Sequence, residues 1–414
     1  MIFLYRIIIN FIIILSPLII LIRLLKKKEH PIRFKEKFCF FPIKRENGKL
    51  VWFHGSSVGE ILSIIPLVEK LEKIKSIKKI LVTSSTLSSS KVLTKFKLKK
   101  TVHQFFPIDA NFLTKKFLDY WNPAIAIFVE SEIWPNMLVN VKKKSIPLVL
   151  LNARITKKSY KKWKMISFLS KFLFGSFDVS FPQNYETKKY LNSLGAKKIK
   201  FLGNLKFSES KTQKNIALNK NIEKIFKSRK IWCAVSTHNG EEKICAEAHQ
   251  KLKKKYKKLL TVIIPRHVHR VNDIYKEILD MGFKVQIHSK KSKIKKDTDI
   301  YLVDTYGETK SFFKICNTVF LGGSIVNHGG QNPLEPARFG CKILHGPNIQ
   351  NFTEVYRLLN KENLSFKFYN TNQLAKSVNQ SLNQNINFSK KITKLKKIGS
   401  NILNHTSTEI NCFL

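Results

Sequence analysis

The chain has 414 residues, enough for two domains of ordinary size, each with its own hydrophobic core. A hydrophobic fraction of 43% and an aromatic fraction of 11% exclude a disordered chain. The formal net charge of +47 is extreme, but the lysines are spread along the chain and no RNA- or DNA-binding motif lies among them, so we expect no nucleic-acid partner. We attribute most of this charge to codon drift in an AT-rich genome, because Lys, Ile, Asn and Phe are over-used together. The functional interpretation is that the positive charge attracts the protein to an anionic membrane.

Residues 1–25 are predicted to form a hydrophobic membrane anchor, with no charge between Arg6 and Arg23. This apolar stretch is slightly shorter than the roughly 20 residues that a spanning helix needs, so it either spans the bilayer or enters one leaflet. A cleavable signal peptide would need a small-residue cleavage site, and a basic run follows instead. A buried core helix is the other alternative. Lys26, Lys27 and Lys28 favour a cytoplasmic location for the rest of the chain.

The cysteines indicate a reducing compartment and no metal site. They form no C-x-x-C pair, and several lie in apolar runs where a free thiol behaves as a small hydrophobe. The six are Cys39, Cys233, Cys245, Cys316, Cys341 and Cys412.

The remainder alternates short apolar runs with helix-compatible stretches, which predicts parallel, doubly wound sheets. A polar segment at 203–220 interrupts the pattern and divides it into domains at 33–205 and 206–385, followed by a helical tail at 386–414. The predicted strands lie in KLVWFHG, KKILVTSS, PAIAIFVES and IPLVLLNAR, then in KIWCAVSTH, LLTVIIPRH, FKVQIHS, DIYLVDTYGE and NTVFLGGS. Ligands bind beyond the carboxyl ends of such strands, so we expect an enzyme whose site lies in a cleft between the two sheets.

The first strand is followed by HGSSVGE, in which Ser57 and Glu60 have the spacing of a helix capping box. Capping explains both residues without any function. It does not explain the small neighbours Gly55, Ser56 and Gly59, which let a substrate approach the backbone. The motif alone leaves open whether Glu60 is a cap or a catalytic base.

Two further groups in the first half are candidates for chemistry. Glu130 and Glu132 follow the strand in FVESEIWPN, and Lys206 in GNLKF could neutralise a phosphate or a carboxylate. Solvated loop carboxylates and an ordinary surface lysine are the alternatives.

The second half carries an anion-binding pattern. Arg266 follows a strand, and Glu241 begins a predicted helix after STHNG. The glycine pairs of LGGSIVNHGGQNPLEPARFG precede a helix whose N-cap, first and third positions are predicted at Asn332, Pro333 and Glu335. No Walker lysine and no D-x-D follow, so neither a P-loop nor a metal-bridged pyrophosphate is indicated.

In this order, these motifs resemble the 3-deoxy-D-manno-octulosonic acid (Kdo) transferases of lipopolysaccharide assembly, over most of residues 50–352. The matching blocks are WFHGSSVGE, VESEIWPN, LNARIT, GNLKF, STHNGEE, PRHVHR, DTYGE, GGSIVNHGGQNPLEPARFG and GPNIQNF. The departures are Gly55-Ser56, Asn239 and Gln331, and none removes a residue expected to do chemistry.

The resemblance implies a GT-B fold of two facing Rossmann-like domains, with inverting transfer of Kdo from CMP-Kdo to a lipid A precursor at the cytoplasmic face of the inner membrane. It implies no cofactor and no metal. It assigns the base to Glu60 and transition-state stabilisation to Glu130 and Lys206. It also implies a CMP site, and the small residues of the first motif are candidates for the acceptor. The implied CMP-site residues are Pro265, Arg266, Tyr306, Gly307, Glu308, Asn332, Pro333, Leu334 and Glu335, and the acceptor candidates are Ser56, Ser57 and Gly59.

Two other functions stay open at this point. One is another GT-B transferase acting on a lipid, such as a heptosyltransferase-like enzyme. The other is a non-catalytic protein that binds the membrane surface. The presence of Glu60, Arg266 and Glu335 together argues against this second function.

Overall fold

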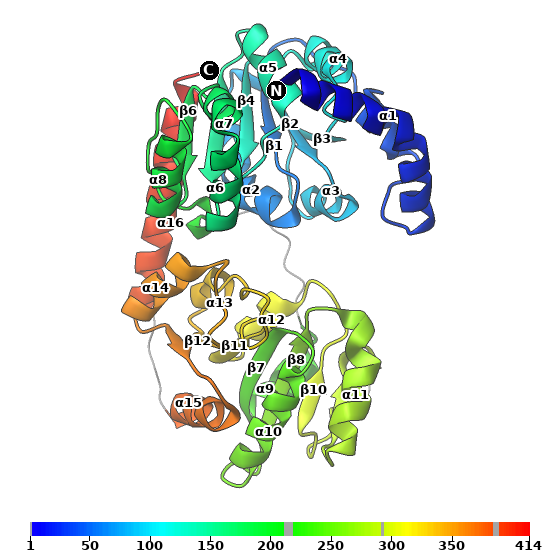
Figure 1. The fold of residues 1–414 in the computed structure, drawn as a ribbon. Coiled ribbons are helices and arrows are strands. Elements are labelled where there is room, and N and C mark those ends of the chain that lie inside the picture. The colour runs from blue at the N-terminus through cyan, green and yellow to red at the C-terminus, as the bar shows by residue number, and fades with distance from the viewer. Residues whose placement is uncertain (1, 211–217, 291–293, 384–388) are drawn as a thin grey trace. The chain divides into compact units, whose positions relative to one another are not determined.

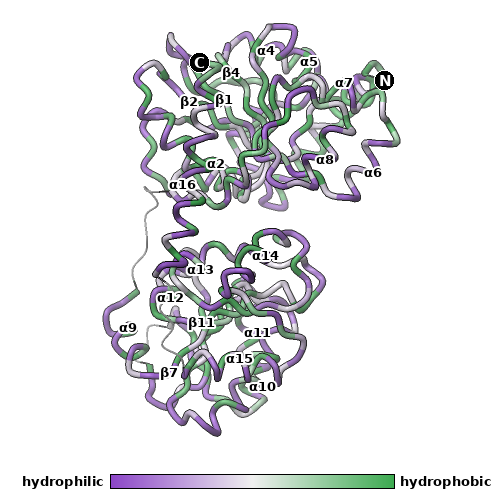
Figure 2. The backbone as a smooth tube through the Cα atoms, turned by 90° about the vertical axis from the view of Figure 1, so that its left-hand side faces the viewer, coloured by the Kyte–Doolittle hydropathy of each residue, from purple (hydrophilic) through white to green (hydrophobic). Residues whose placement is uncertain are grey.

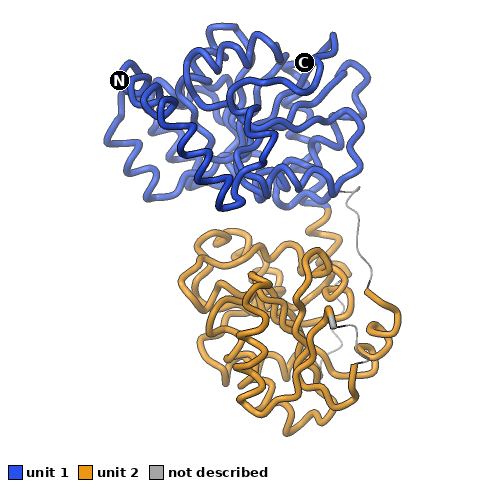
Figure 3. The backbone as a smooth tube through the Cα atoms, turned by 90° about the vertical axis from the view of Figure 1, so that its right-hand side faces the viewer, with its two compact units in different colours: residues 1–214, 397–414 blue, residues 215–396 orange. Residues whose placement is uncertain are grey.

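A computed structural model describes residues 2–210, 218–290, 294–383 and 389–414. The chain divides into two compact units, the first formed by 1–214 and 397–414 and the second by 215–396 (Figure 3). Part of the predicted polar linker at 203–220 and the start of the predicted tail at 386 lie outside the described residues.

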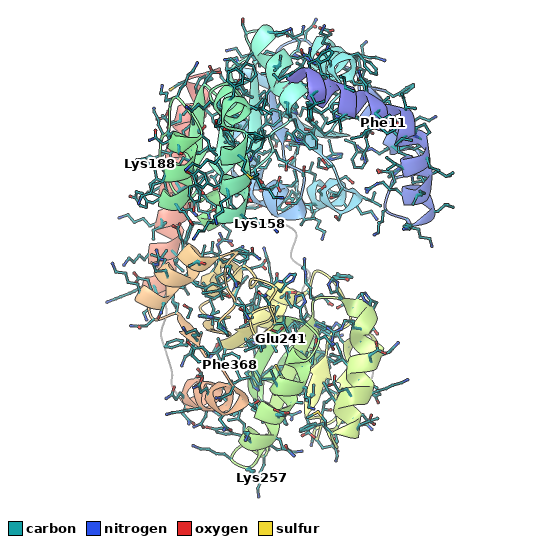
Figure 4. All side chains as sticks on the ribbon, in the orientation of Figure 1. Phe11, Lys158, Lys188, Glu241, Lys257 and Phe368 are labelled. Atoms are coloured by element: carbon teal, nitrogen blue, oxygen red, sulfur yellow. The ribbon has the colours of Figure 1, made fainter. Side chains whose placement is uncertain are left out.

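The first helix of the chain, α1 (Ile2–Leu25), belongs to the first unit. Tyr5 donates a hydrogen bond to Asp109 (2.8 Å), and the guanidinium of Arg6 donates one to Asn136 (3.0 Å). Ile9 and Ile13 pack on the core of this unit. Most other apolar side chains of α1 are exposed, Phe11 among them (Figure 4).

The first unit is built on six parallel strands in the order β3-β2-β1-β4-β5-β6 (Figure 1). This is the strand order of a Rossmann fold, in which the direction of winding reverses between β1 and β4. The strands are β1 (Lys49–His54), β2 (Ile77–Ser84), β3 (Thr101–Phe105), β4 (Ile125–Val129), β5 (Leu148–Ala153) and β6 (Val179–Pro182).

Helices cover both faces of this sheet, because alternate residues of each strand point to opposite faces. Trp52 lies in one apolar cluster with Phe117 and Phe128, whereas Val51 and Phe53 lie in the other. The helical segments are η1 (Arg33–Phe38), α2 (Val58–Leu71), α3 (Leu87–Leu93), α4 (Asn111–Trp121), α5 (Pro135–Lys143), α6 (Lys157–Met165), α7 (Ser167–Phe174), α8 (Tyr185–Ser193) and η2 (Leu205–Phe207).

The second unit is a seven-stranded parallel sheet in the order β13-β12-β11-β7-β8-β10-β9. Its direction reverses between β7 and β11. The strands are β7 (Lys230–Thr237), β8 (Leu259–Pro265), β9 (Val285–Ile287), β10 (Ile300–Leu302), β11 (Thr318–Leu321), β12 (Lys342–His345) and β13 (Ser365–Lys367). The helices are α9 (Lys220–Lys227), α10 (Glu241–Lys253), η3 (Val268–Arg270), α11 (Val271–Asp280), η4 (His288–Lys290), α12 (Thr309–Phe313), α13 (Leu334–Arg338), α14 (Thr353–Lys361) and α15 (Thr371–Asn383).

The last helix, α16 (Ser389–Asn411), returns to the first unit from residue 397 onward. Ile402 and Ile410 are buried in the same apolar cluster as Val51 and Phe53. Gly399 lies against the backbone of Phe207, and an added Cβ there would come within 2.2 Å of a carbonyl oxygen.

The predicted fold class is confirmed, because the chain forms two parallel α/β sheets with an apolar N-terminal helix. In Figure 2 the central strands of both units are hydrophobic, as expected for strands buried on both faces. Four strands were not predicted: β3, β6, β12 and β13. β3 and β13 are edge strands with polar side chains, and such strands lack a continuous apolar run.

Candidate active site

Glu60 lies in the first turn of α2, directly after the loop that leaves β1. Ser57 is the N-cap of this helix, and its hydroxyl accepts from the backbone N–H of Glu60 (3.3 Å). The carboxylate of Glu60 in turn accepts from the hydroxyl of Ser57 (2.7 Å) and from the backbone N–H of Ser56 (2.7 Å). In a standard capping box the carboxylate accepts from the N-cap N–H. Here it is displaced toward the loop.

The surroundings of Glu60 raise the pKa of its carboxyl group above that of an ordinary, solvent-exposed glutamate. Burial, followed by the negative charges of Glu132 and Glu130, raises the pKa of Glu60 from 4.5 to about 7, despite the hydrogen bonds from Ser57 and Ser56. A general base is most effective when its pKa lies near the working pH. Glu60 therefore has the basicity that proton abstraction requires.

Glu130 is buried after β4 and forms an ion pair with the half-buried Lys206 (2.6 Å between Nζ and Oε1). Its backbone has a positive φ of 57°, which is uncommon for a glutamate and directs the chain out of the strand. Lys206 is held in place by its neighbours: Leu205 donates its N–H to the side chain of Asn152 at the end of β5 (3.0 Å). Two residues that are distant in sequence are thus brought together at the edge of the sheet.

The position of these groups follows from the topology of the sheet. β1 and β4 are hydrogen-bonded neighbours, with His54 opposite Phe128, so their carboxyl ends lie side by side. The winding reverses at this point, where parallel sheets bind their ligands. Glu60 follows β1, and Glu130 follows β4. The three residues predicted to be catalytic therefore lie at one edge of one unit.

In the second unit the equivalent reversal point is organised by Glu241, which sequence analysis placed only in a helical first turn. Glu241, labelled in Figure 4, is fully buried, and its carboxylate accepts from the backbone N–H of His238 (2.9 Å). It also accepts from the N–H groups of the loop after β11: Gly323 (2.7 Å), Ser324 (3.1 Å) and Ile325 (2.9 Å). Glu241 fixes the first glycine pair of the long motif to the start of α10.

The predicted CMP residues lie in loops at the carboxyl ends of the strands of the second unit. Arg266 follows β8 and is exposed, while Pro265 is buried at the strand end. Tyr306 is 68% exposed, and Gly307 has a positive φ of 95°. Glu308 accepts from Nε2 of His288 (3.0 Å) and from the hydroxyl of Thr305.

The helix predicted to begin after Asn332 starts one residue later than expected. Pro333 is the N-cap of α13, so Glu335 occupies the second helical position instead of the third. The side chain of Asn332 nevertheless accepts from the N–H of Leu334 (3.1 Å), which is the capping hydrogen bond predicted for it. Lys310 of α12 lies 3.8 Å from the carboxylate of Glu335, so a cation accompanies this acidic side chain.

Histidines gather at the same edge of the second unit, a feature that spacing in the sequence did not predict. The rings of His238 and His328 are 4.3 Å apart, and His267 lies 6.0 Å from His238. A Cβ added to Gly323 would come within 3.3 Å of both His238 and His328, so this position favours glycine. Among the described residues, no group of three His, Cys, Asp or Glu side chains is placed to hold a metal ion.

The first half of the chain, residues 32–209, matches the family model described as 3-deoxy-D-manno-octulosonic-acid transferase. The 3-deoxy-D-manno-octulosonic acid transferase of Rickettsia bellii is 34% identical over 337 residues, 81% of this chain and 80% of that one. That of Haemophilus influenzae is 30% identical over 312 residues, 75% of this chain and 73% of that one. A probable mitochondrial transferase of the same name from Arabidopsis thaliana is 30% identical and covers 84% of this chain.

Solved structures of low identity share the fold. A putative UDP-N-acetylglucosamine 2-epimerase from Listeria monocytogenes is 13% identical, with a TM-score of 0.57, and covers 85% of this chain and 91% of its own. The UDP-GlcNAc 2-epimerase of Neisseria meningitidis is 15% identical, with a TM-score of 0.56, and covers 88% of this chain and 99% of its own. These likenesses show a GT-B-type pair of Rossmann-like units. The sequence identities over most of both chains show more: this protein belongs to the 3-deoxy-D-manno-octulosonic acid (Kdo) transferase family.

Proposed function

We propose that this protein is an inverting transferase that moves Kdo from CMP-Kdo to the lipid A precursor lipid IVA in lipopolysaccharide biosynthesis, without a metal or another cofactor. Membership of the Kdo transferase family supports the transfer of Kdo. The observation that supports the mechanism is the basic carboxylate of Glu60, with a pKa of about 7, at the ligand-binding edge of the first unit.

In this mechanism Glu60 removes the proton from the attacking hydroxyl of the acceptor sugar as the new glycosidic bond forms. The Glu130–Lys206 pair (2.6 Å) supplies a fixed dipole at the same edge, where charge develops in the transition state. Ser56, Ser57 and Gly59 are proposed to contact the acceptor. Near Gly59, an added Cβ would meet only the hydroxyl of Ser57 within 4 Å, at 3.9 Å.

The second unit is proposed to bind CMP-Kdo through the strand-end loops after β8, β10 and β11. Arg266 supplies a positive charge for the phosphate that departs with CMP. We propose that the carboxylates of Glu308 and Glu335 accept hydrogen bonds from ribose hydroxyls, together with Asn332 and the backbone around Pro333 and Leu334. The loop after β11 is held by Glu241, which accepts from Gly323 (2.7 Å) and Ile325 (2.9 Å), so its backbone is already ordered before a ligand arrives.

We also propose that α1 anchors the protein on the cytoplasmic side of the inner membrane. It is the one helix in the described part of the chain that is long and apolar enough to cross a bilayer. Its contacts favour an arrangement within one leaflet: Tyr5, Arg6, Ile9 and Ile13 touch the first unit along one side. The opposite side leaves Phe3, Leu4 and Phe11 exposed, as expected for a helix lying in the interface.

The test is a transfer assay with purified full-length protein in detergent, lipid IVA, and CMP-Kdo generated in situ, in the presence of EDTA. We expect a lipid product that is heavier by Kdo, and we expect Glu60→Gln to lose about 10²-fold or more in turnover while it still binds CMP. Ser57→Ala removes the cap and one proposed acceptor contact but keeps the carboxylate, so it is expected to lower stability by about 1 kcal/mol and to lower turnover by less than Glu60→Gln does. Absence of transfer by the wild-type protein, or full turnover by Glu60→Gln, would contradict the proposal.

A further inference from the structure

A second carboxylate, Glu132, lies beside Glu60 and is fixed by three hydrogen-bond donors. Its Oε2 atom accepts from Nε2 of His54 (3.1 Å), from the hydroxyl of Ser56 (2.5 Å) and from the indole N–H of Trp134 (2.8 Å). The donors come from the end of β1, the loop before α2 and the residue before α5. All three bind the same oxygen, and the side chain of Glu132 is only 13% exposed.

Ser56 connects this carboxylate to Glu60. Its hydroxyl donates to Glu132, and its backbone N–H donates to Oε2 of Glu60 (2.7 Å). One residue therefore holds both carboxylates, and the position of Ser56 depends on the position of Glu132. His54 is fixed in turn, since its Nδ1 is 3.0 Å from the hydroxyl of Thr83 and its ring stacks on Phe106 at 3.7 Å.

We infer that Glu132 is a positioning residue for the transfer reaction: it fixes Ser56, and through Ser56 the carboxylate of Glu60, and it holds a negative charge beside that carboxylate. This inference rests on the proposed function, in which Glu60 is the base. Glu132 itself is not expected to touch the acceptor hydroxyl through Oε2, because three donors already occupy that oxygen.

The charges around Glu60 agree with this role. Two acidic groups act on it, Glu132 and Glu130, and the nearby cation Lys206 is paired with Glu130 at 2.6 Å. Burial alone would raise the pKa of Glu132, but the hydrogen bond and charge of His54, with the hydrogen bonds from Ser56 and Trp134, lower it. Glu132 is therefore ionised over the pH range in which Glu60 gains its proton, so its charge acts on Glu60 throughout that range.

A purely structural role for Glu132 makes a different prediction. If the carboxylate only tied residues 131–134 to β1, its replacement would lower stability or turnover by the same factor at every pH. A charge that sets the basicity of Glu60 instead changes the pH at which activity appears. The two roles are thus separated by the acidic limb of the pH profile, which reports the pKa of the free enzyme's base when kcat/KM is measured.

The test compares wild-type protein with Glu132→Gln in the same transfer assay from pH 5 to pH 9, with CMP binding and thermal unfolding measured in parallel. The amide oxygen of Gln can still accept hydrogen bonds, so the change removes mainly the charge. We expect the acidic limb of kcat/KM to move to lower pH by roughly half a unit to one unit, with a loss of about tenfold at pH 8 and unchanged CMP affinity. Glu46→Gln, which removes an exposed charge near the opposite end of β1, should leave the profile unchanged.

Ser56→Ala tests the positioning step without changing any charge, and it keeps the inference testable if Glu132→Gln does not fold. It should lower kcat about tenfold with an unchanged KM for the acceptor and leave the acidic limb in place, because the backbone N–H remains but its support from Glu132 is lost. A raised KM with unchanged kcat would instead indicate that Ser56 only contacts the acceptor. A Glu132→Gln profile parallel to that of the wild type, or full turnover by Ser56→Ala, would overturn the inference. Absence of transfer by the wild-type protein would instead contradict the proposed function itself.

Discussion

Glu60→Gln is expected to make the protein more stable above pH 7 while it removes activity. The carboxyl of Glu60 has a pKa of 4.5 in the unfolded chain and about 7 in the folded protein, because it is buried beside Glu132 and Glu130. The folded state therefore binds the proton of Glu60 more tightly than the unfolded chain does. The stabilisation that this proton gives the folded state is complete below pH 4.5 and is lost as the pH rises through about 7.

A pKa difference of about 2.5 units corresponds to at most about 3.5 kcal/mol, since one unit is about 1.4 kcal/mol. Glu60 is partly open to solvent, so we expect about 1–2 kcal/mol. Gln carries no charge at any pH and keeps one acceptor for Ser56 or Ser57. At pH 5 it should match the wild type or be slightly less stable through the weaker cap, and at pH 8 it should be more stable.

The measurement is urea unfolding of both proteins in the same detergent at pH 5 and pH 8, at constant ionic strength. At each pH we take the free energy of unfolding of Glu60→Gln minus that of the wild type. The change in this difference between pH 5 and pH 8 reports the titration of Glu60, because the lost cap interaction contributes equally at both pH values and cancels. Other titrating groups, such as Asp109, whose pKa burial raises to about 6, are common to both proteins and cancel as well. A stability difference that is the same at both pH values would refute the assignment of a raised pKa to Glu60.

Two further predictions concern other parts of the molecule. Glu241→Gln should destabilise the second unit by about 2–4 kcal/mol and weaken CMP binding. An amide has only one acceptor oxygen, so at least two of the N–H groups that Glu241 now binds would be buried without an acceptor. These N–H groups belong to His238, Gly323, Ser324 and Ile325. Calorimetric unfolding and CMP titration measure this, with Glu247→Gln of the same helix as the control, since Glu247 accepts one hydrogen bond, from Thr371. Removal of residues 1–28 should abolish cosedimentation with vesicles of zwitterionic lipid, which do not attract the basic residues of the rest of the chain, and undiminished cosedimentation would show that α1 is not the anchor.

The sequence predicted the parts of the fold that depend on local apolar runs. β1, β4, β5, β7 and β8 are buried on both faces, and such strands appear as nearly continuous hydrophobic segments. β3 contains His103 and Gln104, and β13 has three residues, so neither has a run that differs from a loop. Their pairing depends on neighbours elsewhere in the chain.

The same distinction applies to the site. The motif around Glu60 was visible because its cap is local, with Ser57 three residues away. The partners of Glu132 were not visible, since His54 and Ser56 lie 78 and 76 residues from it in the sequence. Glu241 was placed correctly at the start of a helix, but its hydrogen bonds to Gly323 and Ser324 cross 82 and 83 residues. Residue spacing carries no information about contacts that only the assembled sheet creates.

The return of α16 to the first unit has a consequence for how the protein is made. Because the second unit is inserted between 214 and 397, the ribosome must complete it before the residues that finish the first unit exist. Until then the apolar surface that receives Ile402 and Ile410 stays uncovered. A message broken in the second half would thus yield a first unit with an open hydrophobic surface, which chaperones and proteases can recognise. Burial of Ile402 and Ile410 therefore makes completion of the first unit depend on synthesis of the second.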